Sequence, residues 1–178
     1  MANNILKTRT VDLTFGAVMA ALALVIPLAF QRTPLQLNIP ALGYSATLGS
    51  HVPEMLSILA GPVMAFAVGV ASAVGFLVTL SPVVGLRAFT HGIWGALASW
   101  QYRRGWSFLK VMIIIALPIH ALGEGIVVMV FGFPFQAQLI TIVGTGIHHL
   151  IDLAISMAIL RIVQPLLAPI ILTKIRLR

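Results

Sequence analysis

Ionisable side chains recur at helical spacing inside segments that are otherwise apolar. Residues three or four apart lie on one face of an α-helix, so each group presents its members together. A histidine beside a carboxylate can hold a fixed tautomer, carry a proton or bind a ligand. A charge near the centre of a bilayer costs about 3 kcal/mol, so such groups face a partner or a cavity. The groups are His51 with Glu54, Arg87 with His91, His120 with Glu124, and His148 and His149 with Asp152.

Three kinds of chemistry compete for these groups. Hydrogen bonds between helices would explain any single histidine, whereas several polar faces together favour a ligand cavity. A metal site is the third possibility, and the residues of suitable ligand type are His91, His120, His148, Asp152 and Glu124. The chain has no HExxH motif and no P-loop. We therefore expect no resident metal, no cofactor, no catalytic residue and no ATP hydrolysis, with an intramembrane metal-dependent enzyme as an alternative.

The composition places these groups in a membrane. Of the 178 residues, 60% are hydrophobic and 8% are charged, and the mean hydropathy is +1.06. Soluble domains carry about 25% charged residues. The sequence therefore predicts one membrane-embedded domain over residues 1–178. The first apolar run lacks a small-x-small cleavage site and predicts a retained helix, and the absence of cysteine excludes disulfides and thiolate ligands.

Apolar segments separated by breakers predict an all-α fold with six transmembrane helices. The segments are 11–30, 51–60, 63–80, 86–101, 107–131 and 139–164. A span needs about 20 residues, so the second is expected to tilt or to extend into its neighbours. An even number of spans places both termini on one side of the membrane.

Basic residues set the expected orientation. They flank the spans at Lys7 and Arg9, at Arg103, Arg104 and Lys110, and at Lys174, Arg176 and Arg178, while the opposite loops contain only Arg32. Cytoplasmic loops are enriched in such residues, so both termini are expected in the cytoplasm. The net charge is +7, but the basic residues are not interleaved with aromatic residues along the chain. This pattern excludes a nucleic-acid-binding surface.

Two loops on the outer side are candidates for covering a pocket. The loop 31–50 is long and Pro-rich, and 131–138 (FGFPFQAQ) is aromatic. Connections of this length in a compact protein are usually functional or disordered. We expect the first loop to form a lid or wall over an outward-facing pocket, with a plain connector as the alternative.

The first span has small residues four apart, at Ala17 and Ala21. Such spacing lets another helix approach closely, either within this chain or from a partner.

Two stretches carry a resemblance to a known family. They are ATLGSHVPEMLSILAGPVMAFAVGVASAVGFLVT and VVGLRAFTHGIWGAL, within residues 46–98. Together with the length, the six spans and the Ala-x-x-x-Ala face, they resemble the substrate-binding S component of an energy-coupling factor (ECF) vitamin importer, a class of ABC transporter. The likeness extends over essentially the whole chain and is to the cobalamin and niacin branch.

The resemblance implies a multi-pass protein of a prokaryotic plasma membrane that binds a vitamin from outside. It would deliver the vitamin by toppling in the bilayer on a transmembrane coupling subunit that works with two ATPase subunits. The family's contact with the coupling subunit corresponds to Ala17 and Ala21. Family substrate contacts correspond to the regions 36–51, 81–91 and 131–138.

Departures from the family pattern limit the choice of vitamin. The chain begins Met-Ala-Asn where the metal-ion branch has Met-His, and it lacks the cysteine with which one cobalamin branch reaches cobalt. Cobalamin or a related corrinoid, in a wide pocket under adaptable loops, is the expected substrate. Niacin, with its carboxylate held by Arg87 and His91, is the alternative. A solitary carrier that needs no partner is a further possibility.

These arguments sort the candidate residues into two sets. Those expected to bind substrate are Tyr44, His51, Glu54, Arg87, His91, Phe133 and Phe135. Those expected to form a structural polar network are His120, Glu124, His148, His149 and Asp152. Within this network, a bond from Asp152 to either His148 or His149 is expected to lock spans four, five and six together beneath the pocket.

Overall fold

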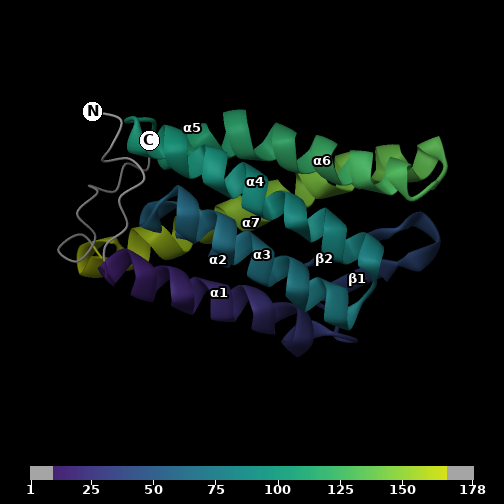
Figure 1. The fold of residues 1–178 in the computed structure, drawn as a ribbon, viewed down its shortest axis with the longest axis horizontal. Helices are drawn as coiled ribbons and strands as arrows, with labels where there is room; N and C mark the ends of the chain where they lie inside the picture. Colours follow the sequence, from purple (N-terminus) through teal and green to yellow (C-terminus); the bar gives the residue numbers. More distant parts are fainter. Residues whose placement is uncertain (1–9, 168–178) are drawn as a thin grey trace.

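The structure, a computed structural model, describes residues 10–167 and is mainly helical (Figure 1). Its elements are α1 (Thr10–Phe30), β1 (Gln36–Ile39), β2 (Tyr44–Thr47), α2 (Val52–Ser57), α3 (Pro62–Thr79), α4 (Pro82–Arg103), α5 (Phe108–Val111), α6 (Leu117–Val130) and α7 (Phe135–Leu167). The orientation was predicted in part from the basic residues at 7, 9, 174, 176 and 178. These residues lie outside the described part of the chain.

Four helical segments are long and apolar enough to cross a membrane: α1, α3, the stretch from α5 to α6, and α7. The protein is therefore membrane-embedded. The other two predicted spans coincide with α2 and α4. Helix α4 has the length of a span but carries Arg87 and His91, whereas α2 has six residues, followed by a 3-10 turn of three, Ile58–Ala60. That segment is shorter than a bilayer requires.

Proline and serine determine where several helices begin. Pro62 and Pro82 lie in the first turns of α3 and α4. A backbone N–H there has no partner within the helix, so the N–H that proline lacks costs no hydrogen bond. The Ser81 hydroxyl accepts a hydrogen bond from the Val84 N–H at 3.4 Å, and Ser107 does the same for Lys110 at 3.3 Å. Both are N-caps of the kind that satisfy free N–H groups.

Helices α3 and α4 approach closely because glycine occupies their contact. A Cβ added to Gly69 would lie 2.1 Å from the Gly92 backbone nitrogen, and one added to Gly92 would lie 3.1 Å from the Phe66 carbonyl oxygen. Without these glycines the two backbones could not pack at this distance. The contact places the polar face of α4, including Arg87 and His91, in the interior of the bundle.

The loop predicted at 31–50 contains a β-hairpin, which the all-α prediction did not include. Strands β1 and β2 form an antiparallel hairpin with Gln36 opposite Thr47 and Ile39 opposite Tyr44. A 3-10 turn, Pro40–Leu42, connects them and ends at Gly43 with φ of +61°. Glycine adopts this left-handed conformation without a steric cost.

Helices α5 and α6 are joined by a π-helical turn, Met112–Ala116. The Met112 carbonyl accepts the Leu117 N–H five residues on. A π turn widens the helix locally and is often found at functional sites.

The bundle has two distinct ends. At one end the turn between α4 and α5 packs near the start of α1, where Arg103 lies 3.8 Å from Asp12 and donates to the Ala60 carbonyl at 2.9 Å. At the other end lie the hairpin, the α3–α4 turn and the α6–α7 turn (Figure 1). There the Gln31 amide donates to the Thr79 carbonyl at 2.8 Å.

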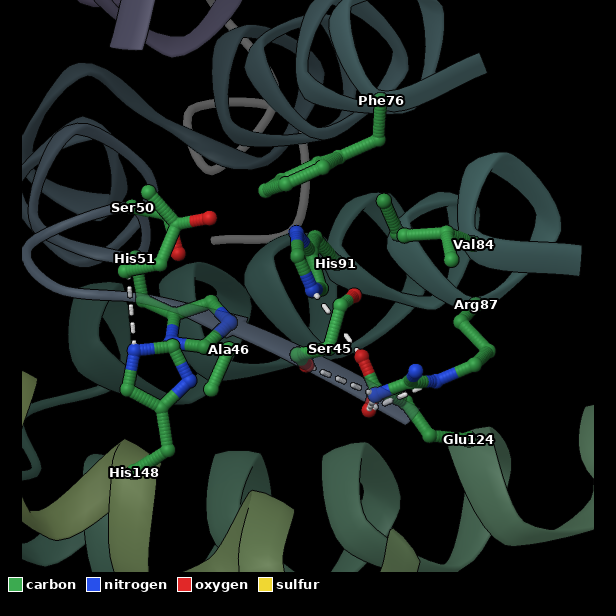
Figure 2. Close-up of a pocket in the computed structure, with 12 residues that line it drawn as sticks. Ser45, Ala46, Ser50, His51, Phe76, Val84, Arg87, His91, Glu124 and His148 are labelled. Atoms are coloured by element: carbon green, nitrogen blue, oxygen red, sulfur yellow. Dashed lines mark hydrogen bonds and ion pairs between the residues drawn. The ribbon is translucent and has the colours of Figure 1, made fainter. Parts of the chain in front are cut away.

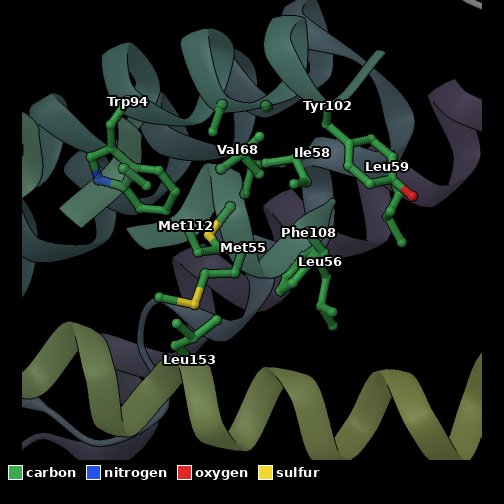
Figure 3. Packing of buried hydrophobic residues seen from close by; sticks show 14 of the residues in the cluster. Met55, Leu56, Ile58, Leu59, Val68, Trp94, Tyr102, Phe108, Met112 and Leu153 are labelled. Atoms are coloured by element: carbon green, nitrogen blue, oxygen red, sulfur yellow. The ribbon is translucent and has the colours of Figure 1, made fainter. Parts of the chain in front are cut away.

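Two buried apolar clusters enclose a polar layer. This layer is the group of buried ionisable residues made of the five histidines, Arg87, Glu124 and Asp152. The larger contains Met55, Trp94, Phe108 and Met112 (Figure 3), and the smaller contains Phe76, Val84 and Ala88. On α4, Arg87 is next to Ala88 of the smaller cluster, and His91 lies between Ala88 and Trp94 of the larger one. All four acidic residues of the chain are buried, Asp12 and Asp152 at 2% and 0% exposure and Glu54 and Glu124 at 0% and 5%.

Candidate functional site

All five histidines of the chain meet in the polar layer. They come from the start of α2, from α4, from α6 and from α7. The His51 ring centroid lies 4.7 Å from that of His91, 4.4 Å from that of His120 and 4.5 Å from that of His148. His149 adjoins the group, 5.3 Å from His120. The sequence placed these residues on four helix faces, and the fold brings the faces together.

A small, partly enclosed cavity adjoins the histidines (Figure 2). It has about 20 Å³ of free space, room for one or two water molecules. The hairpin and α4 supply most of its wall. Its lining residues are Ser45, Ala46, Thr47, Ser50, His51, Phe76, Val84, Arg87, Ala88, His91, Glu124 and His148.

Arg87 and Glu124 form a buried ion pair across α4 and α6. The Arg87 guanidinium donates to Glu124 Oε2 from Nε at 3.1 Å and from a terminal nitrogen at 2.5 Å. It also donates to the Gly43 carbonyl at 2.7 Å and the Ser45 carbonyl at 3.3 Å, which attaches the hairpin to α4. The Thr145 hydroxyl donates to the same carboxylate oxygen at 2.5 Å. Glu124, expected to be structural, therefore lines the cavity with Arg87.

Hydrogen bonds determine the tautomers of two histidines on α6 and α7. His149 Nε2 lies 3.2 Å from the Met112 carbonyl oxygen and must donate to it. Neutral His149 then has a bare Nδ1, which accepts from His120 Nδ1 at 3.1 Å. Neutral His120 consequently has a bare Nε2, which lies 3.3 Å from Glu124 Oε1. Two lone pairs face each other there unless a cation lies between them.

Asp152 anchors the hairpin to α7. Its carboxylate accepts the backbone N–H of Gly49 at 2.8 Å and that of His51 at 3.0 Å. His148 Nε2 lies 3.2 Å from Asp152 and donates to the Thr47 carbonyl at 3.0 Å. Of the two partners left open for Asp152, the structure therefore selects His148. The expected lock among spans four, five and six is wrong, because Asp152 binds the segment before α2 instead.

The remaining candidate residues lie around the cavity rather than in it. The Glu54 carboxylate faces Gly95 of α4, and neither of its oxygens has a hydrogen-bond partner among residues 10–167. The Phe133 ring packs against Gly43 at the hairpin turn, so the two outer loops do meet. Phe135 is 64% exposed and does not reach the cavity.

Tyr44 lines a second hollow on the other side of the hairpin. This groove has about 370 Å³ of free space and is mostly apolar. It shares Ala46 and His148 with the cavity, so only a thin wall separates the two. Burial raises the pKa of Tyr44 above its usual value of 10, an effect that the nearby Arg87 partly offsets.

Ala17 and Ala21 lie on the exposed side of α1. The inward side of the same helix contains Gly16, Met19 and Ala23. The side of α1 that carries Ala17 and Ala21 is therefore the exposed one.

Several residues of the site carried no signal in the sequence. Ser45, Ser50 and Thr145 are common residues without a motif, and only the fold brings them to the cavity or to Glu124. Ser72 of α3 lies 3.2 Å from His91 Nδ1. A lone serine in an apolar helix is the one signal that could have identified it, since such hydroxyls often bond across helices.

No protein-family model, no curated protein and no solved structure matches this chain.

Proposed function

We propose that the protein is the substrate-binding S component of an ECF-type vitamin importer in a prokaryotic plasma membrane. The observation that carries the proposal is the partly enclosed cavity with polar lining residues beneath the hairpin, inside a membrane-embedded bundle. Polar groups within a membrane usually line a substrate path or a binding cavity. The chain would bind the vitamin and would hydrolyse no ATP itself.

The arrangement of the bundle supports six passes with cytoplasmic termini. The chain reverses at alternate ends, and the hairpin with α2 takes the place of the second pass. Arg103, Arg104 and Lys110 lie at the end opposite the hairpin. Positive residues favour the cytoplasmic side, so the hairpin and the cavity would face outward.

The hairpin would act as the lid. Its attachments are side chains of α4 and α7, since Arg87 binds the Gly43 carbonyl and Asp152 binds the Gly49 N–H. The cavity is too small for a vitamin while the hairpin is closed. Displacement of Ala46 would join the cavity to the apolar groove and create space for a ligand.

The lining favours a small heteroaromatic vitamin of the niacin class. Phe76 and Val84 form an apolar wall, and Arg87, Glu124 and His91 form a polar one (Figure 2). A flat ring with a single polar substituent matches these two walls. The corrinoid expected from the sequence would need a much wider opening, so niacin becomes the first candidate and cobalamin the second.

The exposed alanines on α1 support a protein partner. Ala17 and Ala21 would contact the transmembrane coupling subunit, which would connect this chain to two ATPase subunits. Small residues four apart permit close helix contact in a bilayer.

Binding by the isolated chain tests the proposal. Native mass spectrometry of the purified protein against nicotinic acid, nicotinamide, benzoate and cobalamin should show one bound niacin-type ligand. A panel without any bound ligand would refute the proposal. Binding of cobalamin alone would restore the corrinoid assignment and refute niacin.

A pair of variants on α4 controls for location. Ala88→Phe fills the cavity and should abolish binding, whereas Leu97→Phe adds the same ring at a position that is 42% exposed and should leave binding unchanged. Thermal unfolding of both variants checks that they fold. Equal binding by a folded Ala88→Phe would place the site elsewhere.

A further inference from the structure

The histidines of the polar layer form a group of metal-ligand geometry. One ring nitrogen from each of His51, His91 and His120 lies within 4.8 Å of the others. All three residues are buried, at 3%, 1% and 0% exposure. The residues come from α4, α6 and the turn before α2, so the arrangement arises from tertiary packing rather than from spacing on one helix.

A carboxylate oxygen adjoins two members of the group. Glu124 Oε1 lies 3.5 Å from His91 Nε2 and 3.3 Å from His120 Nε2. Two ligands about 2.1 Å from a tetrahedral metal ion are about 3.4 Å apart, which agrees with both distances. The other oxygen, Oε2, is held by Arg87, so Oε1 is oriented toward the histidines. A contraction of up to about 1.4 Å from their limit of 4.8 Å would bring the three histidine nitrogens to the same separation.

Two histidine nitrogens in or beside this group have no hydrogen-bond partner among the described residues, and His120 Nε2 contacts only Glu124 Oε1, at 3.3 Å. His91 Nε2 and His51 Nδ1 are buried and make no hydrogen bond with any residue of the described chain. His51 Nδ1 lies 3.0 Å from Asp152 Oδ2 but outside hydrogen-bond geometry. One proton could bridge His120 Nε2 and Glu124 Oε1, yet it would leave His91 unsatisfied. A metal ion would satisfy His91 Nε2, His120 Nε2 and Glu124 Oε1 together.

Contacts to their second ring nitrogens orient two of the proposed ligands, His91 and His120, as is usual in metal sites. A ligating histidine usually engages its second nitrogen in a hydrogen bond, which sets its tautomer. His91 Nδ1 has the Ser72 hydroxyl at 3.2 Å, and His120 Nδ1 donates to His149. His149 in turn donates to the Met112 carbonyl in the π turn. The relay leaves Nε2 of neutral His120 bare, the form that binds a metal, and His91 Nε2 is bare as well when its Nδ1 donates to the Ser72 hydroxyl.

Charge balance also favours a cation. Arg87 and Glu124 neutralise each other, and Asp152 is a further buried carboxylate with no Lys or Arg within ion-pair distance among the described residues. A net negative charge in a membrane interior is costly. A divalent ion would reverse the sign and provide a positive centre beside the cavity.

From these observations we propose that His51, His91 and His120, with Glu124 Oε1, form a resident binding site for a late first-row divalent cation, zinc foremost. Imidazole and carboxylate donors suit this class of ion. The neighbouring group of His51, His148 and Asp152 also has ligand geometry. Its oxygens and His148 Nε2 are already hydrogen-bonded to the hairpin, so we assign the ion to the first group.

Metal analysis of the full chain tests the site. The protein is purified with an affinity tag that contains no histidine, and its metal content is measured by inductively coupled plasma mass spectrometry. We expect about one zinc per chain, falling at least tenfold in His91→Gln and His120→Gln. His148→Gln is the matched control and should keep its metal. Loss in His148→Gln alone would move the site to the second group and overturn the assignment.

A second measurement avoids dependence on variant folding. X-ray absorption at the zinc edge of the unmodified protein should show imidazole scattering from three histidines. A zinc-free protein that also fails to bind added Co²⁺ would refute the site. The proposed function fails separately. Niacin binding by a protein that holds no zinc and takes up no Co²⁺ would leave the importer proposal standing and refute the metal centre. Bound zinc without any vitamin binding would refute the importer proposal and leave the metal centre standing.

Discussion

Replacing Glu124 by glutamine tests whether the buried ion pair holds the polar layer together. Glutamine has the shape of glutamate and keeps an oxygen for Thr145, so the change removes mainly a charge. Arg87 is 2% exposed and would be left as an unpaired cation in the bundle interior. Removing one partner of a buried ion pair costs about 3–5 kcal/mol. We expect the free energy of unfolding to fall by that amount.

Glu54→Gln is the matched control. Glu54 is also buried in the bundle, but its carboxylate has no hydrogen-bond partner in residues 10–167. The same substitution there removes no ion pair, so its effect should stay within about 1 kcal/mol. Unfolding in mixed micelles, followed by tryptophan fluorescence, gives the free energy of each variant.

A double-mutant cycle completes the test. Arg87→Gln alone leaves Glu124 unpaired and deprives the Gly43 and Ser45 carbonyls of a donor. The double variant should be less destabilised than the sum of the single ones, with a coupling energy of about 2–3 kcal/mol. If Glu124→Gln is as stable as Glu54→Gln, or if the two substitutions are additive, the ion pair does not stabilise the fold and the argument fails.

Three further predictions address the fold and the partner. Gly69→Ala should destabilise the bundle by at least about 2 kcal/mol because its Cβ would overlap α4, whereas Gly146→Ala, whose Cβ would find its nearest neighbour at 4.0 Å, should be neutral or slightly stabilising in the same unfolding assay. Asp152→Asn should lose one of the two side-chain oxygens that accept backbone N–H groups and so loosen the hairpin, seen as faster limited proteolysis of the loop around Gly49; unchanged proteolysis would show that the anchor is dispensable. Ala21→Phe should abolish vitamin uptake by cells with the complete transporter and leave binding by the isolated chain intact, and uptake at the wild-type rate would contradict the proposed partner face.

The long helices were predictable because apolar runs end at recognisable breakers. The span expected at 11–30 is α1, Thr10–Phe30, and that at 63–80 is α3, Pro62–Thr79. The hairpin was not predictable in the same way. Its strands have four residues each, too few for a clear alternation, and they are held in place by side chains of α4 and α7.

Spacing along a helix identified some contacts of the site and not others. His120 lies 3.3 Å from Glu124, and His148 lies 3.2 Å from Asp152, as the i,i+4 rule predicts. The bond between Arg87 and Glu124 joins different helices, and spacing says nothing of which helices are neighbours. For the same reason the convergence of five histidines emerged only from the fold.

The burial of every carboxylate has a consequence for the outside of the protein. Titration of an acid can hardly alter the outer surface of the described chain, whose exposed formal charges are all positive and include Arg32, Arg104 and Arg161. Near the turn between α4 and α5, the exposed positive side chains would attract anionic phospholipid headgroups. Each nearby Lys or Arg would contribute about 1 kcal/mol. The lipid composition of a vesicle is therefore a variable that sets how firmly this end of the protein is held at the membrane surface.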